Sequence, residues 1–327
     1  MPIDWNPLLP IVEQAETFVL TSHMRPDCDA LGSELGMAAA LQALGKRVRI
    51  INGDSVPSHI AFIDAGGMIE VFGSGVTQQE VHEADVHMVL DTSAWGQLGP
   101  MADVIRSSPA RKVVIDHHVS GDDLGAMVLK DVTSESNGRL VLQAIEALGV
   151  ELTAEMARPL FYAMATDTGW FRFSSVTEQT LLAAAKLVAA GASPSDSFST
   201  LYDRNTLSRV RLHGRIMEST ALVLDGRVGV ARATEADFAA TGAEAADTED
   251  VVNRVLSIAG VEVAALFVEL GEGANKVSLR SRSDFDVREI AEQFGGGGHT
   301  KAAGVRIRGP IDEAQRKVLE AIQAKIG

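Results

Sequence analysis

The sequence predicts an α/β protein built from two domains. Its 327 residues are about twice the roughly 150 residues of a typical domain. Short apolar, β-branched segments alternate with Ala- and Leu-rich segments through the first half, which is typical of a parallel sheet with helices on both faces. Strand-like segments return near residue 220, after a long helical stretch. We therefore expect an N-terminal parallel-sheet domain over 1–203, a helical connector over 204–219 and a smaller C-terminal α/β domain over 220–327.

The N-terminal elements follow a regular pattern. Strands are expected where short apolar and β-branched runs occur, over 17–21, 47–51, 86–90 and 112–115. The Ala- and Leu-rich helix 30–44 ends at Gly45, which suits a helix C-cap. Further helices are expected over 136–148, 153–166, 177–190 and 194–202.

The C-terminal third mixes strands with shorter helices. A polar helix over 205–220 is the expected connector, and the acidic, Ala-rich segment 234–250 is expected to be a solvated surface element. The expected strands are 222–224, 228–231, 261–269, 276–280 and 305–307, and the expected helices are 248–258, 286–294 and 311–325.

The charge balance limits the classes of partner. The formal net charge is −15, from 29 basic and 44 acidic side chains. A sequence-blind grip on long nucleic acid needs a basic face, so we expect no long nucleic acid as partner. A small anionic substrate is compatible if metal ions supply local positive charge.

The compartment is predicted from what the chain lacks. The single cysteine, Cys28, excludes an internal disulfide and suits a reducing compartment. The N-terminal stretch has no signal-peptide pattern, and no apolar run of about 20 residues predicts a membrane span. We expect a cytoplasmic protein that does not bind membranes.

Acidic and histidine side chains recur where the predicted N-terminal elements end. Because ligands of an open parallel sheet bind outside the carboxyl ends of its strands, we expect these side chains to meet at one edge. A single Asp after a strand is most often a turn residue or a helix N-cap, but here several independent segments deliver such groups together. The residues are His23, Asp27, Asp29, Asp91, Asp116, His117, His118 and Asp167.

Such a cluster of like charges needs compensation. Buried carboxylates are unstable without partners, and five carboxylates with three imidazoles exceed the needs of one ion. The set suits two divalent ions that clamp the oxygens of a phosphoryl transfer. Oxygen and nitrogen ligands without thiolates favour Mn²⁺, with Mg²⁺ or Co²⁺ as alternatives, over a structural zinc site.

The motifs around these residues resemble those of the DHH phosphoesterases. The matching segments are HMRPDCDALGS (23–33), VLDTS (89–93), DHH (116–118) and DTG (167–169). The resemblance implies that His23 and Asp27 bind one metal ion, that Asp29, His117 and Asp167 bind the other, and that Asp91 bridges them. It further implies that Asp116 orients His117 and that His118 faces the substrate phosphate and assists departure of the leaving oxygen. Cys28 stands where the family usually has Gly, and we expect a tolerated small residue rather than a ligand.

A glycine run in the C-terminal domain is the second motif that indicates function. The run Phe294–Gly304 (FGGGGHTKAAG) could be a flexible linker, but it lies between a predicted helix and a predicted strand, and glycines let backbone N–H groups approach an anion. It resembles the GGGH signature of the C-terminal domain in one DHH subgroup, where it binds the nucleotide part of the substrate. That resemblance implies six substrate-binding residues: Arg280, Gly296, Gly297, Gly298, His299 and Lys301.

The subgroup with these two domains is the nanoRNase/pAp phosphatase type. It implies manganese-dependent hydrolysis of short oligoribonucleotides and of 3′-phosphoadenosine 5′-phosphate (pAp), by attack of a hydroxide held between two ions. A cyclic or linear dinucleotide (c-di-AMP or pApA) phosphodiesterase is the main alternative. An inorganic pyrophosphatase, a RecJ-like single-strand exonuclease and a catalytically idle nucleotide sensor are further alternatives. A homodimer remains open.

Two groups of residues are expected to lie outside the site. His82 and His87 flank a polar turn and are expected at the surface. Trp170 and Phe171, close behind Asp167, are expected to pack in the core, as large aromatic side chains usually do.

Overall fold

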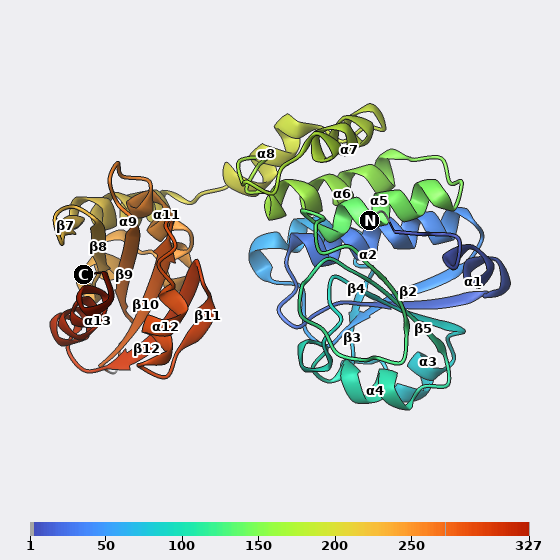
Figure 1. Cartoon of the computed structure of the whole chain (residues 1–327), viewed down its shortest axis with the longest axis horizontal. Helices are drawn as coiled ribbons and strands as arrows, with labels where there is room; N and C mark the ends of the chain where they lie inside the picture. Colours follow the sequence, from blue (N-terminus) through green and yellow to red (C-terminus); the bar gives the residue numbers. More distant parts are fainter. Residues whose placement is uncertain (1–2, 272, 327) are drawn as a thin grey trace. The chain divides into compact units, whose positions relative to one another are not determined.

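The computed structural model describes residues 3–271 and 273–326. The chain divides into two compact units, Met1–Arg204 and Asn205–Gly327, each with its own sheet (Figure 1). No helix in the described ranges is long and apolar enough to cross a membrane.

The first unit is built on a six-stranded sheet in which every neighbouring pair is parallel. The strand order is β3-β2-β1-β4-β5-β6, so the chain reverses its winding between β1 and β4, the position where open α/β sheets bind ligands. This confirms the predicted fold class. The short edge strands β3 and β6 were not predicted. The strands are β1 (Thr17–Thr21), β2 (Arg47–Asn52), β3 (Ile69–Val71), β4 (Val86–Leu90), β5 (Arg111–Asp116) and β6 (Met127–Lys130).

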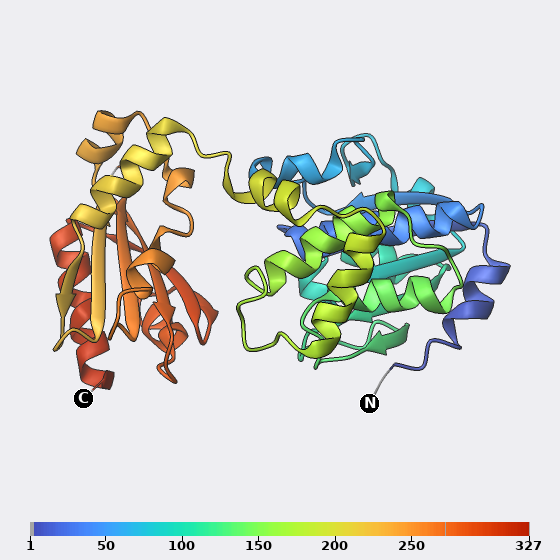
Figure 2. The ribbon, with the colours of Figure 1, turned by 90° about the horizontal axis from the view of Figure 1, so that it is seen from above.

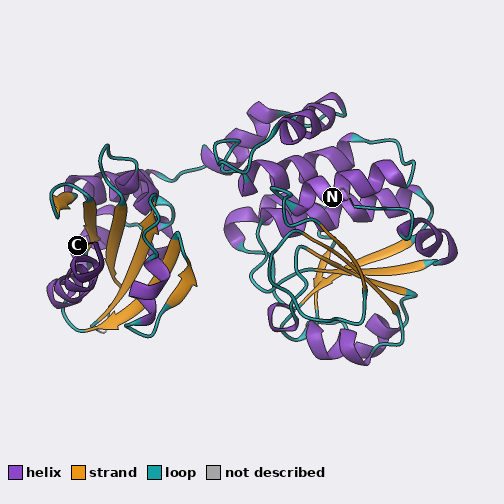
Figure 3. Ribbon diagram, in the orientation of Figure 1, coloured by secondary structure: helices purple, strands orange, loops and turns teal. Residues whose placement is uncertain are grey.

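Helices cover both faces of this sheet (Figure 3). On one face Phe18 and Leu20 of β1 pack with buried residues of α1, α2, α5 and α6, and on the other Val19 packs with residues of α3 and α4. Trp170 and Phe171 pack against the first of these cores, as predicted. The helices are α1 (Leu8–Gln14), α2 (Cys28–Ala43), α3 (Gln78–His82), α4 (Met101–Ser107), α5 (Asn137–Ala147), α6 (Ala154–Asp167), α7 (Glu178–Ala189) and α8 (Pro194–Tyr202), with short 3₁₀ helices η1 (Ser58–Asp64) and η2 (Trp95–Gln97).

Helices α2 and α6 pack closely because α2 carries glycines at the contact. A Cβ atom on Gly32 would lie 2.3 Å from the Pro159 carbonyl oxygen, and one on Gly36 would lie 2.7 Å from the Leu160 side chain. This close approach brings the N-terminus of α2, with Asp29, near the C-terminus of α6, with Asp167.

The second unit has a mixed sheet of order β11-β12-β10-β9-β8-β7. Only β8 and β9 pair in parallel among its described strands. Helices α12 and α13 cover one face, and α9 and α11 cover β8 and β9 on the other; Figure 2 shows α9 in yellow and α13 in red on different sides of the strands. The strands are β7 (Ala221–Val223), β8 (Val228–Ala233), β9 (Val263–Glu269), β10 (Ala274–Ser281), β11 (Gly297–His299) and β12 (Ala302–Arg308).

The remaining elements surround this sheet. They are α9 (Leu207–Glu218), α10 (Glu235–Thr241), η3 (Ala245–Thr248), α11 (Val251–Leu256), α12 (Val287–Glu292) and α13 (Ile311–Ile326). Helix α9 coincides with the segment predicted as a connector, but its Leu212 and Ile216 are fully buried against β8 and β9. The apolar side of this otherwise polar helix therefore makes it an integral part of the second unit.

Candidate metal centre

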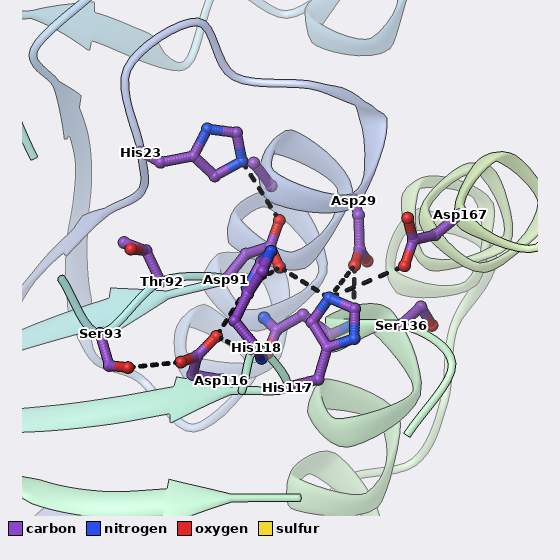
Figure 4. Close-up of polar contacts among 12 residues, drawn as sticks. His23, Asp29, Asp91, Thr92, Ser93, Asp116, His117, His118, Ser136 and Asp167 are labelled. Carbon is purple, nitrogen blue, oxygen red and sulfur yellow. Dashed lines mark hydrogen bonds and ion pairs between the residues drawn. The ribbon is translucent and has the colours of Figure 1, made fainter. Parts of the chain in front are cut away.

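Four segments bring acidic and imidazole groups together at the carboxyl edge of the first sheet (Figure 4). They are the loop after β1 with the start of α2, the end of β4, the end of β5, and the C-terminus of α6. Three overlapping groups of side chains have ligand atoms within 4.8 Å of one another: His23, Asp27 and Asp91; Asp29, His117 and Asp167; and Asp91, His117 and His118.

Asp91 lies at the centre of this cluster. It follows the last residue of β4, is 2% exposed and has a φ of +61°, a conformation uncommon outside glycine that concentrates at functional sites. One carboxylate oxygen lies 3.4 Å from Nε2 of His23, and the other lies 3.3 Å from Nε2 of His117. Asp91 thus contacts both halves of the cluster.

The two histidines present the same ring nitrogen to the carboxylates. Nδ1 of His23 lies 3.0 Å from the Met24 carbonyl oxygen, and Nδ1 of His117 lies 3.1 Å from that of Ser134. A carbonyl accepts only from a protonated nitrogen, so in a neutral ring Nε2 carries the lone pair. Both lone pairs then face carboxylate oxygens, an arrangement that needs either a proton or a metal ion between the groups.

Asp29 is held by the start of a neighbouring helix. Its carboxylate accepts hydrogen bonds from the amides of Asn137 (2.7 Å) and Gly138 (2.8 Å) at the N-terminus of α5. A helix N-terminus favours negative charge. A Cβ atom on Gly138 would lie 2.6 Å from Cβ of Ala163, so only glycine allows this approach of α5 to α6. Asp27 caps α2 by accepting from the Asp29 and Ala30 amides.

The excess of carboxylates shifts the proton affinities of the cluster. Burial, together with the charges of Asp91 and Asp167, raises the pKa of Asp29 well above its usual value, and burial raises the pKa of Asp167 to about 7. Burial opposes protonation of His117 and His23, but the hydrogen bonds and charges of the carboxylates outweigh it. They raise the pKa of His117 to about 10 and that of His23 to about 9. The protein groups therefore demand positive charge at this position, and the donor set fits divalent cations.

Asp116 is fully buried and makes four polar contacts from the end of β5. One oxygen accepts from Nδ1 (2.9 Å) and the backbone amide (3.0 Å) of His118. The other accepts from the Ser93 hydroxyl (2.6 Å) and lies 2.8 Å from Nζ of Lys130. The expectation that Asp116 orients His117 is therefore wrong, because the Ser134 carbonyl takes that place and Asp116 holds His118 instead.

Comparisons with known proteins identify the family. The model of the DHH family, N-terminal domain, matches residues 17–185, and the model of the DHHA1 domain matches residues 226–327. The chain belongs to the DHH family. Membership makes it a metal-dependent phosphoesterase, as the motifs predict.

Two relatives of this DHH chain are both named bifunctional oligoribonuclease and PAP phosphatase NrnA. The protein of Thermus thermophilus is 31% identical over 94% of this chain and 89% of its own length. That of Bacillus subtilis is 27% identical over 94% of this chain and 95% of its own. A crystal structure of an exopolyphosphatase-related protein from Bacteroides fragilis superposes with a TM-score of 0.91, covering 98% of this chain and 95% of that one at 28% identity.

Cys28, at the position where DHH proteins usually have Gly, is buried among apolar side chains. It packs with Leu31 and Ile60. Burial, with the charges of Asp27 and Asp29, raises the pKa of its thiol to about 12. Its contacts with Leu31 and Ile60 fit the expected small packing residue.

The glycine run in the DHHA1 region is structured. Gly297–His299 forms β11, which pairs with β12. Cβ atoms on Gly296 and Gly298 would lie 2.4 and 2.5 Å from carbonyl oxygens of β12, whereas Gly297 meets nothing within 4 Å. Gly296 and Gly298 are thus required for pairing, and β11 leaves Gly297 and His299 exposed.

The other two predicted substrate residues of the second unit already have contacts within it. Arg280 is half-buried on β10 and donates to the Leu279 carbonyl. The ammonium of Lys301 donates to the Ser283 carbonyl and lies 3.9 Å from Asp284.

Several supporting groups were not found from the sequence. Ser93 ends the VLDTS segment but nothing in the sequence indicates its role, and Lys130 is a single lysine on an edge strand that was not predicted. The Met24 and Ser134 carbonyls have no side-chain signal. His87 is 1% exposed, so its predicted surface position is wrong: it lies inside β4, where its Nε2 contacts the Val81 carbonyl and the Ser108 hydroxyl.

Proposed function

We propose that this chain hydrolyses short oligoribonucleotides and pAp with the help of two divalent metal ions, Mn²⁺ before Mg²⁺ or Co²⁺. The observation that carries the proposal is the position of Asp91, whose two oxygens face the Nε2 atoms of two histidines with occupied Nδ1 atoms. The names of the relatives from Thermus thermophilus and Bacillus subtilis support the choice of substrates.

In this proposal His23 and Asp27 hold one ion, Asp29, His117 and Asp167 hold the other, and Asp91 serves both. Bound divalent ions supply Lewis-acid polarisation of the phosphoryl group and neutralise charge that develops on its oxygens. The Ser134 and Met24 carbonyls fix the ring orientations of His117 and His23. The amides of Asn137 and Gly138 hold Asp29 in place.

His118 is the proposed proton donor to the leaving oxygen. Its Nδ1–H is directed to Asp116, so in the imidazolium form the Nε2–H is the proton that can pass to the leaving oxygen. The ring is half exposed, so a substrate can reach it. Lys130 and Ser93 keep Asp116 in the orientation that holds the His118 ring.

The second domain, over 220–327, is proposed to hold the nucleotide part of the substrate. Arg280, His299 and Lys301 supply positive or hydrogen-bonding groups, and Gly296, Gly297 and Gly298 supply exposed backbone. The catalytic domain is proposed to extend over 1–203, and the segment 204–219 that follows it in the chain carries α9, which packs on the second domain.

The test is a substrate and metal panel with the purified full chain. After EDTA treatment, activity on pAp, pApA, a pentaribonucleotide, c-di-AMP, pyrophosphate and long single-stranded DNA is measured with Mn²⁺, Mg²⁺ or Co²⁺. We expect turnover of the first three substrates with Mn²⁺. Preferred turnover of c-di-AMP, pyrophosphate or long DNA would point to the corresponding alternative, and nucleotide binding without turnover to a sensor.

Two variants and one control test the residue assignments. Asp91→Asn is expected to abolish all activities and to lower the affinity for Mn²⁺ measured by titration calorimetry, because it removes a negative charge that both proposed metal sites share. His118→Gln is expected to reduce kcat while leaving Mn²⁺ binding intact. Asp103→Asn, which changes an exposed carboxylate on α4, serves as the matched control. Full activity of Asp91→Asn would refute the central role of Asp91.

A further inference from the structure

Two buried polar side chains, Asn52 and Glu34, join the loop that carries His23 to helix α2. The backbone amide of Ser22, the residue before His23, donates to Oδ1 of Asn52 at the end of β2 (2.9 Å). Nδ2 of Asn52 in turn donates to Oε2 of Glu34 on α2 (2.9 Å). Because the Ser22 amide can only donate, it fixes which end of the Asn52 side chain faces Glu34. We call Asn52 and Glu34 the buried pair, since both are 0% exposed.

Asn52 contacts the loop at the point where it leaves the sheet. The last backbone pair between β1 and β2 is Leu20 with Ile50. Two residues further on, the Ser22 amide donates to a side chain, that of Asn52, in place of a strand carbonyl. This hydrogen bond belongs to the residue directly before His23, so it sets the direction in which the loop leaves the strand.

The backbone after His23 is fixed as well. The Met24 amide donates to the Gln97 carbonyl (2.6 Å), and the Met24 carbonyl lies 3.0 Å from Nδ1 of His23. A Cβ atom on Gly53 would lie 3.0 Å from Sδ of Met24, so the end of β2 passes close to the loop. The orientation of the His23 ring therefore depends on contacts on both sides, of which Asn52 makes the first.

The buried pair also links the loop to the helix of a second candidate ligand. Asp27 is the N-cap of α2, and Glu34 lies in the same helix. Nε2 of His23 lies 4.0 Å from Oδ1 of Asp27. The separation of these two ligand atoms depends on how the loop is held against α2, which is the link that Asn52 provides.

Burial of Glu34 is unfavourable for the fold by itself. Its Oε1 has no hydrogen-bond partner among the residues that the structure describes, and an unsatisfied buried polar group costs free energy that an apolar side chain would not. Burial raises the pKa of Glu34 to about 8, although the Asn52 hydrogen bond opposes the shift. Exceptions of this kind to core packing are expected at functional sites, and the hydrogen bond that Glu34 accepts is the one that anchors Asn52.

We propose that Asn52 is a positioning residue for the metal ion bound by His23 and Asp27, and that Glu34 holds Asn52 in place. The proposal rests on the proposed function, because it takes His23 and Asp27 as ligands of one ion. Since Asn52 acts through the His23 loop, its loss affects the affinity for this ion and leaves that for the other ion nearly unchanged. Partners of metal ligands commonly change metal affinity by about 10–100-fold.

The test measures Mn²⁺ binding to the full chain by titration calorimetry after EDTA treatment. Asn52→Ala removes both hydrogen bonds of that side chain. Asn275→Ala is the matched control, because Asn275 is also a buried strand asparagine (1% exposed) and its Nδ2 donates to the Ile307 and Gly309 carbonyls in the second unit. Thermal unfolding followed by circular dichroism verifies that each variant is folded.

We expect Asn52→Ala to weaken the binding of one of two Mn²⁺ ions about tenfold, and Asn275→Ala to leave both affinities within about twofold of the wild type. The Mn²⁺ concentration that half-saturates pAp hydrolysis should rise by the same factor in Asn52→Ala. Unchanged Mn²⁺ affinity in folded Asn52→Ala, even with a lower unfolding temperature, would overturn the proposal, because Asn52 would then only stabilise the fold.

A double variant identifies the site that is weakened. If Asn52 acts through His23, then Asn52→Ala combined with His23→Ala should bind Mn²⁺ no more weakly than His23→Ala alone. An additional loss in the double variant would place the effect at the other ion and would contradict the positioning role.

Two substitutions of Glu34 test its part of the buried pair. Glu34→Gln keeps a neutral side chain of the same length, whose oxygen can accept from Nδ2 of Asn52, so we expect the Mn²⁺ affinities of the wild type. Glu34→Ala leaves Asn52 without its anchor and should weaken the same ion as Asn52→Ala. Equal losses in Glu34→Gln and Glu34→Ala, or no loss in either, would refute the role of Glu34, and this comparison also decides the proposal if Asn52→Ala does not fold.

Failure of the proposed function looks different in the same experiments. If the wild type binds two Mn²⁺ ions but hydrolyses no nucleotide, the proposed substrates are wrong, and the calorimetry still decides the role of Asn52. If pAp and pApA are hydrolysed while Asn52→Ala binds Mn²⁺ as the wild type does, only the positioning proposal fails. A wild type that binds fewer than two ions overturns both.

Discussion

The contact between Asp116 and Lys130 yields the sharpest stability prediction for this chain. The Asp116 carboxylate is fully buried and receives four contacts, of which the Lys130 ammonium supplies the only full positive charge from a lysine or arginine in the described ranges. These contacts hold the pKa of Asp116 well below its usual range. Breaking a buried ion pair from one side costs about 3–5 kcal/mol because a charge is left without its partner. Lys130 is 18% exposed, so we expect Lys130→Met to cost about 3 kcal/mol, at the lower end.

A double-mutant cycle separates this pair from its surroundings. Asp116→Asn removes the charge that Lys130 compensates, so the double variant should cost about 2 kcal/mol less than the sum of the two single variants. Urea unfolding at pH 7 is followed by tryptophan fluorescence, because Trp5, Trp95 and Trp170 are the three tryptophans of the chain and all lie in the first unit.

Lys112→Met is the matched control for the cycle. The Lys112 ammonium donates to the Ser108 carbonyl, and no carboxylate lies within 4 Å of it among the described residues. The loss should therefore stay below about 1 kcal/mol. Additivity of Lys130→Met and Asp116→Asn within about 0.5 kcal/mol would show that the two side chains do not stabilise each other.

Two further predictions concern packing and pH. Gly36→Ala should destabilise the first unit by about 1–3 kcal/mol, because the new Cβ would lie 2.7 Å from Leu160. Gly214→Ala on α9 meets nothing within 4 Å and should stabilise the second unit by about 0.5–1 kcal/mol, which calorimetry can compare; equal effects would contradict the packing geometry. Burial, with the charge of Lys112, lowers the pKa of His87 from 6.5 to about 4. Below pH 6.5 the unfolded state binds a proton at His87 that the folded state does not. The contribution of neutral His87 to the free energy of unfolding is therefore complete above pH 6.5. It declines as the pH falls towards 4, by up to about 3 kcal/mol. His87→Gln should flatten this part of the unfolding free energy between pH 7 and 4.5; an unchanged pH profile would mean that His87 does not titrate as a buried group.

Most helices and strands were predictable because they follow from the local pattern of apolar and polar residues. The strands at 17–21, 86–90 and 112–115 are mostly buried and are short, largely apolar runs, and helices such as 153–166 carry a clear apolar side. The missed strands β3 and β6 are short and lie at the two edges of the sheet. Edge strands are only partly buried, so their composition does not stand out from that of loops.

The candidate site was likewise predictable only in part. Residue types and their positions after strands were sufficient to predict which side chains gather, because a parallel sheet delivers its carboxyl ends to one edge. The hydrogen-bond partners of these side chains were not predictable. Asp116 contacts His118 rather than its direct neighbour His117, and Nδ1 of His117 contacts the carbonyl of Ser134, which lies 17 residues further along the chain.

The sequence by itself determined the family, the two α/β sheets and the set of groups at the candidate metal centre, because these follow from local periodicity and from short motifs. Only the tertiary structure decided the partners of those groups, the burial of His87 and the pairing of the C-terminal strands. Each of these depends on contacts between segments distant in the chain, such as α2 with α6 or β10 with β12, and such contacts are set by packing and strand register, which no local pattern records.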